Sequence, residues 1–378
     1  MVSRVLFGLF LAAGSPGFAA ADGASLHLTL PPALYAVPGV PLGVYFDNVV
    51  LTPAPDQYRF EVTCPVGASA ARRWELLPTD ADVGRHEFVL VVRDGRGMEL
   101  DRAATTVHVV PRTAGAGRPL RLLMVGDSLT NATHYPNELA RLLTTPGNPA
   151  WTMLGSHRPA AAAPGVAHEG YGGWTWKSFL SLYTPAEEKS AAGPLARKRT
   201  SPFIFPDAAG RPQLDIARYV REAGGGKPPD VVTFLLGIND CFSANPEDPA
   251  AVERSITAAL DHAEKLLAAF RAACPEAALA IGLTTPPNAR ESGFEASYKG
   301  KYRRWGWKRI QHRLVQRMIA QFGGRAGQGV HLVPTQVNLD PFEGYPENNG
   351  VHPNVSGYRQ IGASLYAWLK WHAAATGR

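Results

Sequence analysis

The chain has 378 residues, of which 45% are hydrophobic and 19% are charged, and its formal net charge is +6. This composition excludes a disordered or fibrous protein, and the length favours two domains over one. The basic residues are scattered apart from short runs, so we interpret them as solvated faces. Nucleic acid is not expected as a partner and remains only a remote alternative.

Residues 1–21 have the pattern of an export signal. Arg4 supplies the positive charge, Val5 to Ala13 form the apolar stretch, and Ala19 to Ala21 form the small-residue cleavage site. We therefore expect an exported protein, periplasmic or secreted, with an uncleaved anchor as the alternative. The apolar stretch is too short to span a bilayer, and no later segment offers about 20 uncharged apolar residues, so no membrane span is expected in the mature chain.

Residues 22–111 alternate apolar and polar side chains. Phe60 and Val62 alternate with polar neighbours, as do Phe88 and Leu90, and Asp94 with the following glycine offers a hairpin turn. This period of two predicts a small all-β sandwich of the immunoglobulin-like kind. We interpret it as a spacer or packing partner rather than a carbohydrate-binding module, because no aromatic platform stands out. Residues 112–118 are small and predict a flexible linker.

Residues 119–378 change to alternating strand and helix patterns. Helical spacing joins Val252, Ile256, Leu260 and Leu267, for example, between two apolar runs. Strands separated by helices predict an α/β domain with a five-stranded parallel sheet that is covered on both faces. The five expected strands are residues 121–125, 151–154, 231–236, 278–283 and 330–333.

Four polar segments fall where these elements end or begin. Ser128 follows the first strand, Asn239 follows the strand at 231–236, Gly173 precedes a helical stretch, and His352 lies in the loop before the last helix. Each could be a cap, a turn or a structural histidine when taken alone. Together they supply a nucleophile, oxyanion donors and a base at the sheet edge where α/β proteins bind ligands, so we favour a catalytic interpretation.

These segments, GDSL, GYGG, GIND and VHPN, resemble the four blocks of the SGNH, or GDSL-type, hydrolases in order. The resemblance implies a flavodoxin-like three-layer α/β/α fold and ester hydrolysis through an acyl-enzyme. It implies that Ser128 is the nucleophile and His352 the general base. The oxyanion hole would comprise the backbone N–H groups of Ser128 and Gly173 and the side-chain amide of Asn239. The competing GxSxG elbow fails, because Thr130 stands where its last glycine would be.

One position departs from the family pattern. The family places an aspartate three residues before the histidine, and this chain has Asn349 there. An amide oxygen can still accept a hydrogen bond from the His352 ring, although it stabilises the imidazolium less. We favour a Ser–His dyad assisted by Asn349 or by a backbone carbonyl. The alternative is a nearby carboxylate from Glu347, Glu343 or Asp340.

The substrate is the least constrained part of the prediction. Trp174, Trp176 and Trp305 are candidate substrate-binding residues, although core packing explains most tryptophans. An exported SGNH-like enzyme with a small β-domain resembles carbohydrate esterases, so our first choice is removal of O-acetyl groups from a carbohydrate. The alternatives are a short-chain lipase or general acylhydrolase, an acyltransferase, and a non-catalytic carbohydrate-binding surface protein with a degenerate hydrolase fold.

Metal and cofactor chemistry is not expected. The spacing of Cys and His resembles no zinc site, and the resemblance implies no cofactor. The three cysteines, Cys64, Cys241 and Cys274, allow at most one internal bridge. A pairing of Cys241 with Cys274 is one alternative, and buried free thiols are the other, which we favour.

Overall fold

The computed structural model describes residues 26–185 and 200–377. The export signal predicted for residues 1–21 lies outside the described residues. Among the helices of the two described stretches, none combines the length and the apolar character that a membrane span needs.

Two small sheets that share one hydrophobic core form the N-terminal region. The first has the strand order β1-β7-β6-β3, with β1 parallel to β7, and the second has the order β2-β5-β4. Trp74 of the second sheet meets Phe88 of the first edge to face, with 5.1 Å between ring centroids. This is the sheet-rich region that the period of two predicts. The strands are Ala33–Ala36 (β1), Leu42–Tyr45 (β2), Arg59–Thr63 (β3), Ala68–Ser69 (β4), Arg73–Leu76 (β5), Gly84–Arg93 (β6) and Glu99–Val109 (β7).

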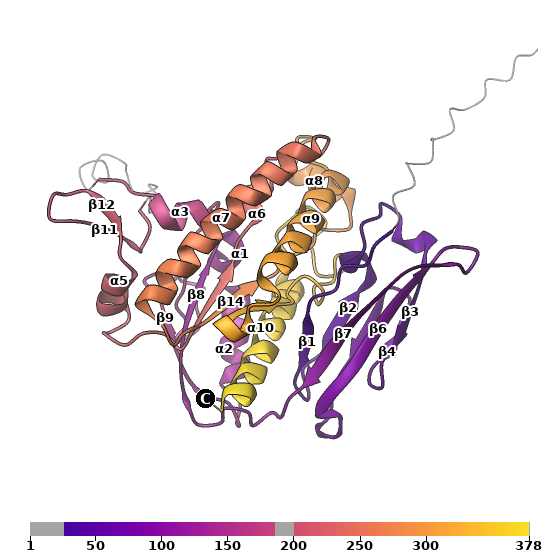
Figure 1. Ribbon diagram of the computed structural model, residues 1–378, viewed down its shortest axis with the longest axis horizontal. Coiled ribbons are helices and arrows are strands. Elements are labelled where there is room, and N and C mark those ends of the chain that lie inside the picture. The colour runs from indigo at the N-terminus through magenta and orange to yellow at the C-terminus, as the bar shows by residue number, and fades with distance from the viewer. Residues whose placement is uncertain (1–25, 186–199, 378) are drawn as a thin grey trace, which may run out of the picture.

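A parallel sheet forms the centre of the rest of the chain (Figure 1). Its order is β9-β8-β13-β14-β15, and the short strand β10 pairs with the carboxyl end of β8 beyond β9. Strands β13 and β14 are buried along their whole length, as expected for strands covered on both faces. This 2-1-3-4-5 order is flavodoxin-like, so the predicted fold class is confirmed. The strands are Pro119–Gly126 (β8), Ala150–Leu154 (β9), Glu169–Gly170 (β10), Val231–Leu235 (β13), Ala278–Gly282 (β14) and Val330–Val333 (β15), with a separate hairpin of Ile204–Pro206 (β11) and Pro212–Leu214 (β12).

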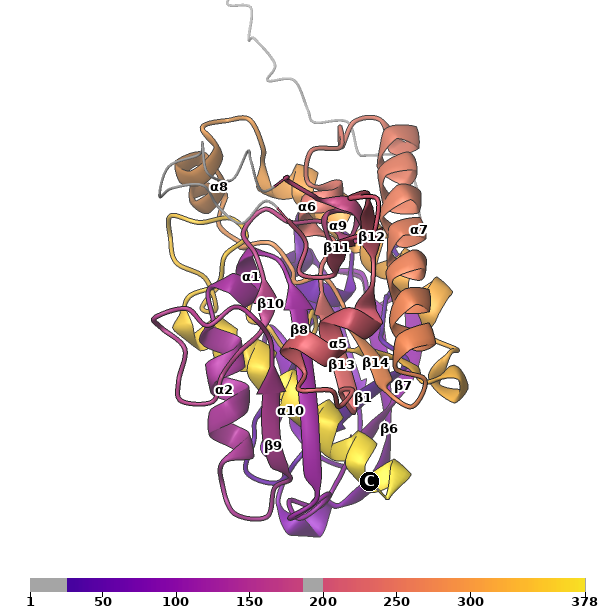
Figure 2. The same cartoon turned by 90° about the vertical axis from the view of Figure 1, so that its left-hand side faces the viewer.

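Helices cover both faces of this sheet (Figures 1 and 2). Helix α2 packs on α10, whereas α7 contacts α3, α5 and α9. Local sequence sets their ends: the Asp248 carboxylate caps α7, and Asn354 caps α10 by accepting from the Gly357 N–H at 3.1 Å. The helices are Ser128–Asn131 (α1), His134–Leu143 (α2), Trp176–Ser181 (α3), Ile216–Ala223 (α5), Ile238–Cys241 (α6), Pro249–Ala273 (α7), Glu291–Tyr298 (α8), Arg304–Phe322 (α9) and Val355–Thr376 (α10).

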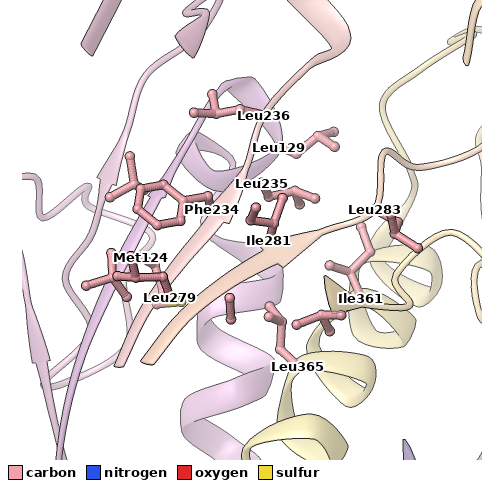
Figure 3. Packing of buried hydrophobic residues seen from close by; sticks show 14 of the residues in the cluster. Met124, Leu129, Phe234, Leu235, Leu236, Leu279, Ile281, Leu283, Ile361 and Leu365 are labelled. Atoms are coloured by element: carbon pink, nitrogen blue, oxygen red, sulfur yellow. The ribbon is translucent and has the colours of Figure 1, made fainter. Parts of the chain in front are cut away.

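The core between the sheet and α10 is close-packed and mostly aliphatic (Figure 3). Met124 of the sheet and Ile361 and Leu365 of α10 are at most 2% exposed. Each buried side chain of this size contributes about 1.5–3 kcal/mol of hydrophobic stabilisation. This packing holds α10 on the sheet and therefore holds the loop that precedes it, which carries His352.

The N-terminal sheets pack beside α9, α10 and the segment after β15 (Figure 1). The Asn48 side chain donates to the carbonyl oxygens of Gln336 and Leu339 at 2.7 and 2.8 Å. Val337, from the same segment, is buried in the N-terminal core. The Lys308 ammonium of α9 is 2% exposed and lies 3.3 Å from an Asp47 carboxylate oxygen. The two parts of the chain are therefore joined by buried polar contacts.

The predicted linker is held in place by hydrogen bonds. Residues 112–118 form turns in which, for example, the Ala116 N–H donates to the Thr113 carbonyl. The buried Lys370 ammonium of α10 donates to the carbonyl oxygens of Ala114 and Gly147 at 2.5 and 3.0 Å. The small residues of this segment thus allow tight turns rather than an extended tether.

The three cysteines form no disulfide. Cys241 and Cys274 are buried, Cys64 is half-buried, and all three thiols are free. The structure therefore has the free-thiol alternative and not the Cys241–Cys274 bridge.

Replacing Lys308 with methionine should destabilise the protein, because the Asp47 carboxylate then loses its counter-ion in a buried interface. We expect the free energy of unfolding to fall by about 3 kcal/mol. The measurement is the urea midpoint, followed by tryptophan fluorescence. A double variant, Lys308→Met with Asp47→Leu, should recover most of the loss, and a single variant as stable as the wild type would contradict the assignment.

Candidate active site

Four segments meet at the carboxyl edge of the parallel sheet. Gly126, at the end of β8, is paired with Leu235 of β13 on one side and with Gly170 of β10 on the other. A side chain at Gly126 would collide with Thr130 Oγ1, which a built Cβ atom meets at 1.9 Å. The chain packs closely at this point, and α1 begins at Ser128, only two residues after the end of β8. The α1 helix and β10 consequently lie together at the end of β8 (Figure 2).

A serine and a histidine make direct contact at this edge. The distance from Ser128 Oγ to His352 Nε2 is 2.8 Å. On the other side of the ring, His352 Nδ1 lies 3.2 Å from the Asn349 side-chain oxygen. The ring is therefore held between a hydroxyl and an amide.

The orientation of the Asn349 amide follows from its other contacts. Its side-chain oxygen also accepts from the backbone N–H groups of Val351 and His352, at 3.1 and 2.9 Å. Because two backbone donors face this atom, it must be the oxygen, and the proton of the imidazole must lie on Nδ1. His352 Nε2 is then an acceptor for the Ser128 hydroxyl, which is the tautomer that a general base requires.

Burial lowers the pKa of His352 below its ordinary value. No carboxylate in the described residues contacts the ring. Asp340 instead accepts from the Phe342 and Glu343 N–H groups, and the exposed Glu343 side chain lies 3.6 Å from Arg290. The structure thus brings Asn349 to His352 and leaves the alternative carboxylates elsewhere.

A residue that the sequence analysis missed supports the histidine loop. Asn288, which follows β14, is fully buried, and its side-chain amide donates to the carbonyl oxygens of Pro346 and Asn349 at 2.9 Å. Its backbone N–H donates to the Gly350 carbonyl, also at 2.9 Å. Asn288 therefore fixes the loop on which Asn349 and His352 lie. The sequence did contain a signal for this role, because Asn288 is a polar residue directly after the Pro286-Pro287 turn, at the same edge of the sheet.

Three N–H groups are available for an oxyanion. The Ser128 N–H lies in the first turn of α1, where a helix offers no acceptor. Gly173 is exposed and has φ +79°, a conformation that a side chain would strain. The Asn239 amide donates one hydrogen to the Trp174 carbonyl at 2.9 Å, which orients the group and leaves its second hydrogen for a ligand.

Two buried aspartates brace this arrangement. Asp127 accepts from the Leu129 N–H at 2.9 Å and caps α1, and Asp240 accepts from the Trp176 N–H at 3.2 Å. Burial raises the pKa of each carboxyl to about 7, and Asp240 adds to the increase at Asp127. Neither contacts His352, so both position loops rather than complete a triad.

A cavity of about 850 Å³ opens beside Ser128 and His352. Gly173 and Asn239 line it, as does Trp174, whose ring packs on Tyr171 with centroids 4.3 Å apart. The polar side chains of Asn131 and His157, which the sequence analysis did not single out, also line it.

The other two candidate tryptophans lie outside this cavity. Trp176 is 2% exposed and packs on Phe234 in the core, so it cannot meet a substrate. Trp305 lines a neighbouring cavity together with Tyr302. The position of a tryptophan relative to the sequence motifs therefore does not predict whether its ring lies in the core or lines the cleft.

The fold and the site together define a serine hydrolase. The chain belongs to the GDSL-like lipase/acylhydrolase family, whose model matches residues 124–360, and it is an ester hydrolase of the serine type. No curated protein sequence matches the chain.

Solved structures with a similar fold include several carbohydrate esterases. A family 3 carbohydrate esterase from Clostridium thermocellum is 19% identical, with 69% of this chain and 100% of that chain covered and a TM-score of 0.41. A family 3 carbohydrate esterase from Talaromyces cellulolyticus is 18% identical, with 68% and 99% covered and a TM-score of 0.39. A family two carbohydrate esterase from Clostridium thermocellum is 15% identical, with 89% and 94% covered and a TM-score of 0.35.

The pH profile should report the His352 environment. A base must be neutral to accept a proton, and the pKa of His352 is lowered by burial, so kcat/KM should remain high until the pH falls below about 6.5. In Asn349→Asp, a carboxylate beside Nδ1 stabilises the imidazolium, so the acid limb should move to higher pH. Profiles of p-nitrophenyl acetate hydrolysis between pH 4 and 8 test this, and an unmoved limb in Asn349→Asp would show that another group holds the ring.

The same site predicts an order of activities at pH 8. Asn349→Asp should be comparable to the wild type or faster, and Asn349→Ala should lose about tenfold, because a hydrogen bond that orients the ring is removed. His352→Ala should lose far more. Equal losses in Asn349→Ala and His352→Ala would contradict the auxiliary role of the amide.

Proposed function

We propose that this protein is an exported esterase that removes O-acetyl groups from a carbohydrate. The observation that carries the catalytic part is the 2.8 Å contact between Ser128 Oγ and His352 Nε2, with the imidazole tautomer set by Asn349. The proposal of export rests on the pattern of residues 1–21.

The arrangement supports acyl transfer in two steps. Ser128 Oγ attacks the ester carbonyl carbon while His352 Nε2 takes the hydroxyl proton, and the N–H groups of Ser128, Gly173 and Asn239 stabilise the oxyanion. The oxyanion collapses, the C–O bond of the ester breaks, and the alcohol leaves with the proton from Nε2. A water molecule, deprotonated by His352 Nε2, then attacks the acyl carbon. The bond from that carbon to Ser128 Oγ breaks, the proton passes from Nε2 to Oγ, and the acid leaves.

The lining of the cavity supports a short acyl group and a polar alcohol. Its aliphatic side chains are Ile238 and Val351, which do not make a channel for a long acyl chain. Apart from two glycines, the remaining lining is aromatic or polar, and the Tyr171 and Trp174 rings, which pack on each other at a tilt, suit the apolar face of a sugar. This combination favours an acetyl ester of a glycan over a long-chain lipid ester.

Hydrolysis of p-nitrophenyl acetate tests the nucleophile. Ser128→Ala should lower kcat by at least about 10³-fold, because the attacking oxygen is lost. Ser181→Ala, at an exposed serine of α3, is the matched control and should retain wild-type activity. Equal rates in Ser128→Ala and the wild type would remove the esterase assignment of this site.

The substrate class needs a second assay. Acetate release from acetylated xylan and pectin should be Ser128-dependent, and p-nitrophenyl esters should be hydrolysed more slowly as the acyl chain lengthens from acetate to palmitate. A preference for the long-chain esters would refute the deacetylase proposal and leave a lipase.

A further inference from the structure

Two polar side chains that line the cavity, Asn131 and His157, have no role in the proposed catalytic steps. Asn131 lies three residues after Ser128 in α1, so it is one turn away on the same helix face. His157 lies in the loop after β9, where its backbone pairs with His168 through two hydrogen bonds of 3.2 and 3.1 Å. Both side chains line the cavity that contains Ser128 and His352.

The two side chains are bonded to each other. His157 Nε2 lies 3.0 Å from the Asn131 side-chain oxygen. An amide oxygen only accepts, so the imidazole donates this hydrogen bond, and the Asn131 Nδ2 group is directed away from the ring. Within the described part of the chain, no residue accepts a hydrogen bond from that Nδ2 group.

The position of the His157 ring is fixed from two other sides. It packs on Tyr171 and against His168, with centroid distances of 5.3 and 5.1 Å. His168 is fully buried, and burial lowers its pKa to about 4, so it stays neutral beside His157. Its Nδ1 accepts from the Gly170 N–H, and its Nε2 donates to the Thr133 hydroxyl, each at 3.1 Å. The pair is therefore pre-organised before a substrate arrives.

We propose that the Asn131 side-chain amide, held in place by His157, recognises the alcohol part of the ester by donating a hydrogen bond from Nδ2 to a hydroxyl group next to the scissile bond. The methyl of an acetyl group offers nothing to hydrogen-bond, and in the proposed mechanism its carbonyl oxygen is taken by the three oxyanion donors. In the ester complex, the Asn131 Nδ2 group can therefore find an acceptor in the alcohol part but not in the acyl part. A hydroxylated alcohol, such as a sugar, offers that acceptor, whereas an alkyl alcohol displaces solvent from Nδ2 and offers none.

This inference rests on the proposed function but makes its own measurable claim. Glyceryl monoacetate and n-propyl acetate carry the same acyl group and a three-carbon alcohol, and they differ only in two hydroxyl groups. The wild type should have the higher kcat/KM for glyceryl monoacetate. The ratio of the two kcat/KM values is then the readout of alcohol recognition.

One variant removes the Asn131 Nδ2 donor, and the other removes the His157 hydrogen bond that orients it. Asn131→Leu is close to isosteric, and His157→Phe keeps the ring packing on Tyr171. Each should lower the ratio about three- to tenfold, mainly through a higher KM for glyceryl monoacetate, as expected for the loss of one or two hydrogen bonds. The matched control is His134→Phe, since His134 is exposed, also packs on a tyrosine, Tyr358, at 5.1 Å, and lies outside the cavity lining.

Three outcomes would overturn the inference: a wild-type ratio near one, an unchanged ratio in both variants, or the same decrease in His134→Phe. A variant that lost kcat/KM equally on both substrates would show that the residue acts in catalysis or in folding instead. Failure of the proposed function is distinguishable, because it appears as Ser128-independent hydrolysis or as absence of acetate release from glycans, neither of which is read from this ratio.

Discussion

A hydroxyl and an imidazole that are separated by 224 positions in the chain lie 2.8 Å apart, and the rest of the fold serves to maintain that contact. Ser128 is placed by the strand β8, which is buried over its last five residues and paired with other strands on both sides. His352 is placed by α10, which the core holds against the same sheet, and by Asn288, which binds the loop from the end of β14. Any change that moves α10 or the histidine loop relative to β8 therefore alters the contact between Ser128 and His352.

The amide behind the histidine is the distinctive feature of this site. Asn349 sets the tautomer through a network in which one oxygen faces three N–H groups. It supplies no charge to stabilise the imidazolium, and burial already disfavours the charged ring. Both features favour the neutral form of the His352 ring, and in the proposed mechanism they give the protonated intermediate weaker support.

The side chains around the cavity are also held by buried hydrogen bonds. Glu169, directly before the GYGG segment, is fully buried and accepts hydrogen bonds from the hydroxyls of Tyr171 and Tyr219. This anchors Tyr171, on which both Trp174 and His157 pack. Trp174 and the Asn131–His157 pair are thus supported by one anchored residue, Tyr171, at the sheet edge.

Sequence patterns predict the sheet and the main site residues because both depend on local signals. Unbroken apolar runs mark strands buried on two faces, and polar motifs that follow them must fall on one sheet edge. The pattern does not predict which loop side chains meet. The positions of Asn288, Asn131 and His157 depend on the paths of separate loops, and Trp176 turns into the core, where it packs on Phe234. The contacts of Lys308 with Asp47 also required the packing of two regions that are remote in sequence.

The central claim is that Ser128 is activated by His352 through this contact. The most direct measurement is labelling of the purified protein with a fluorophosphonate, which reacts with activated serines, followed by mass spectrometry of the peptides. Our account predicts one equivalent of label on Ser128 and a rate that falls steeply in His352→Ala, while Asn349→Ala retains intermediate reactivity. Label on a different residue, or a rate that does not depend on His352, would contradict it.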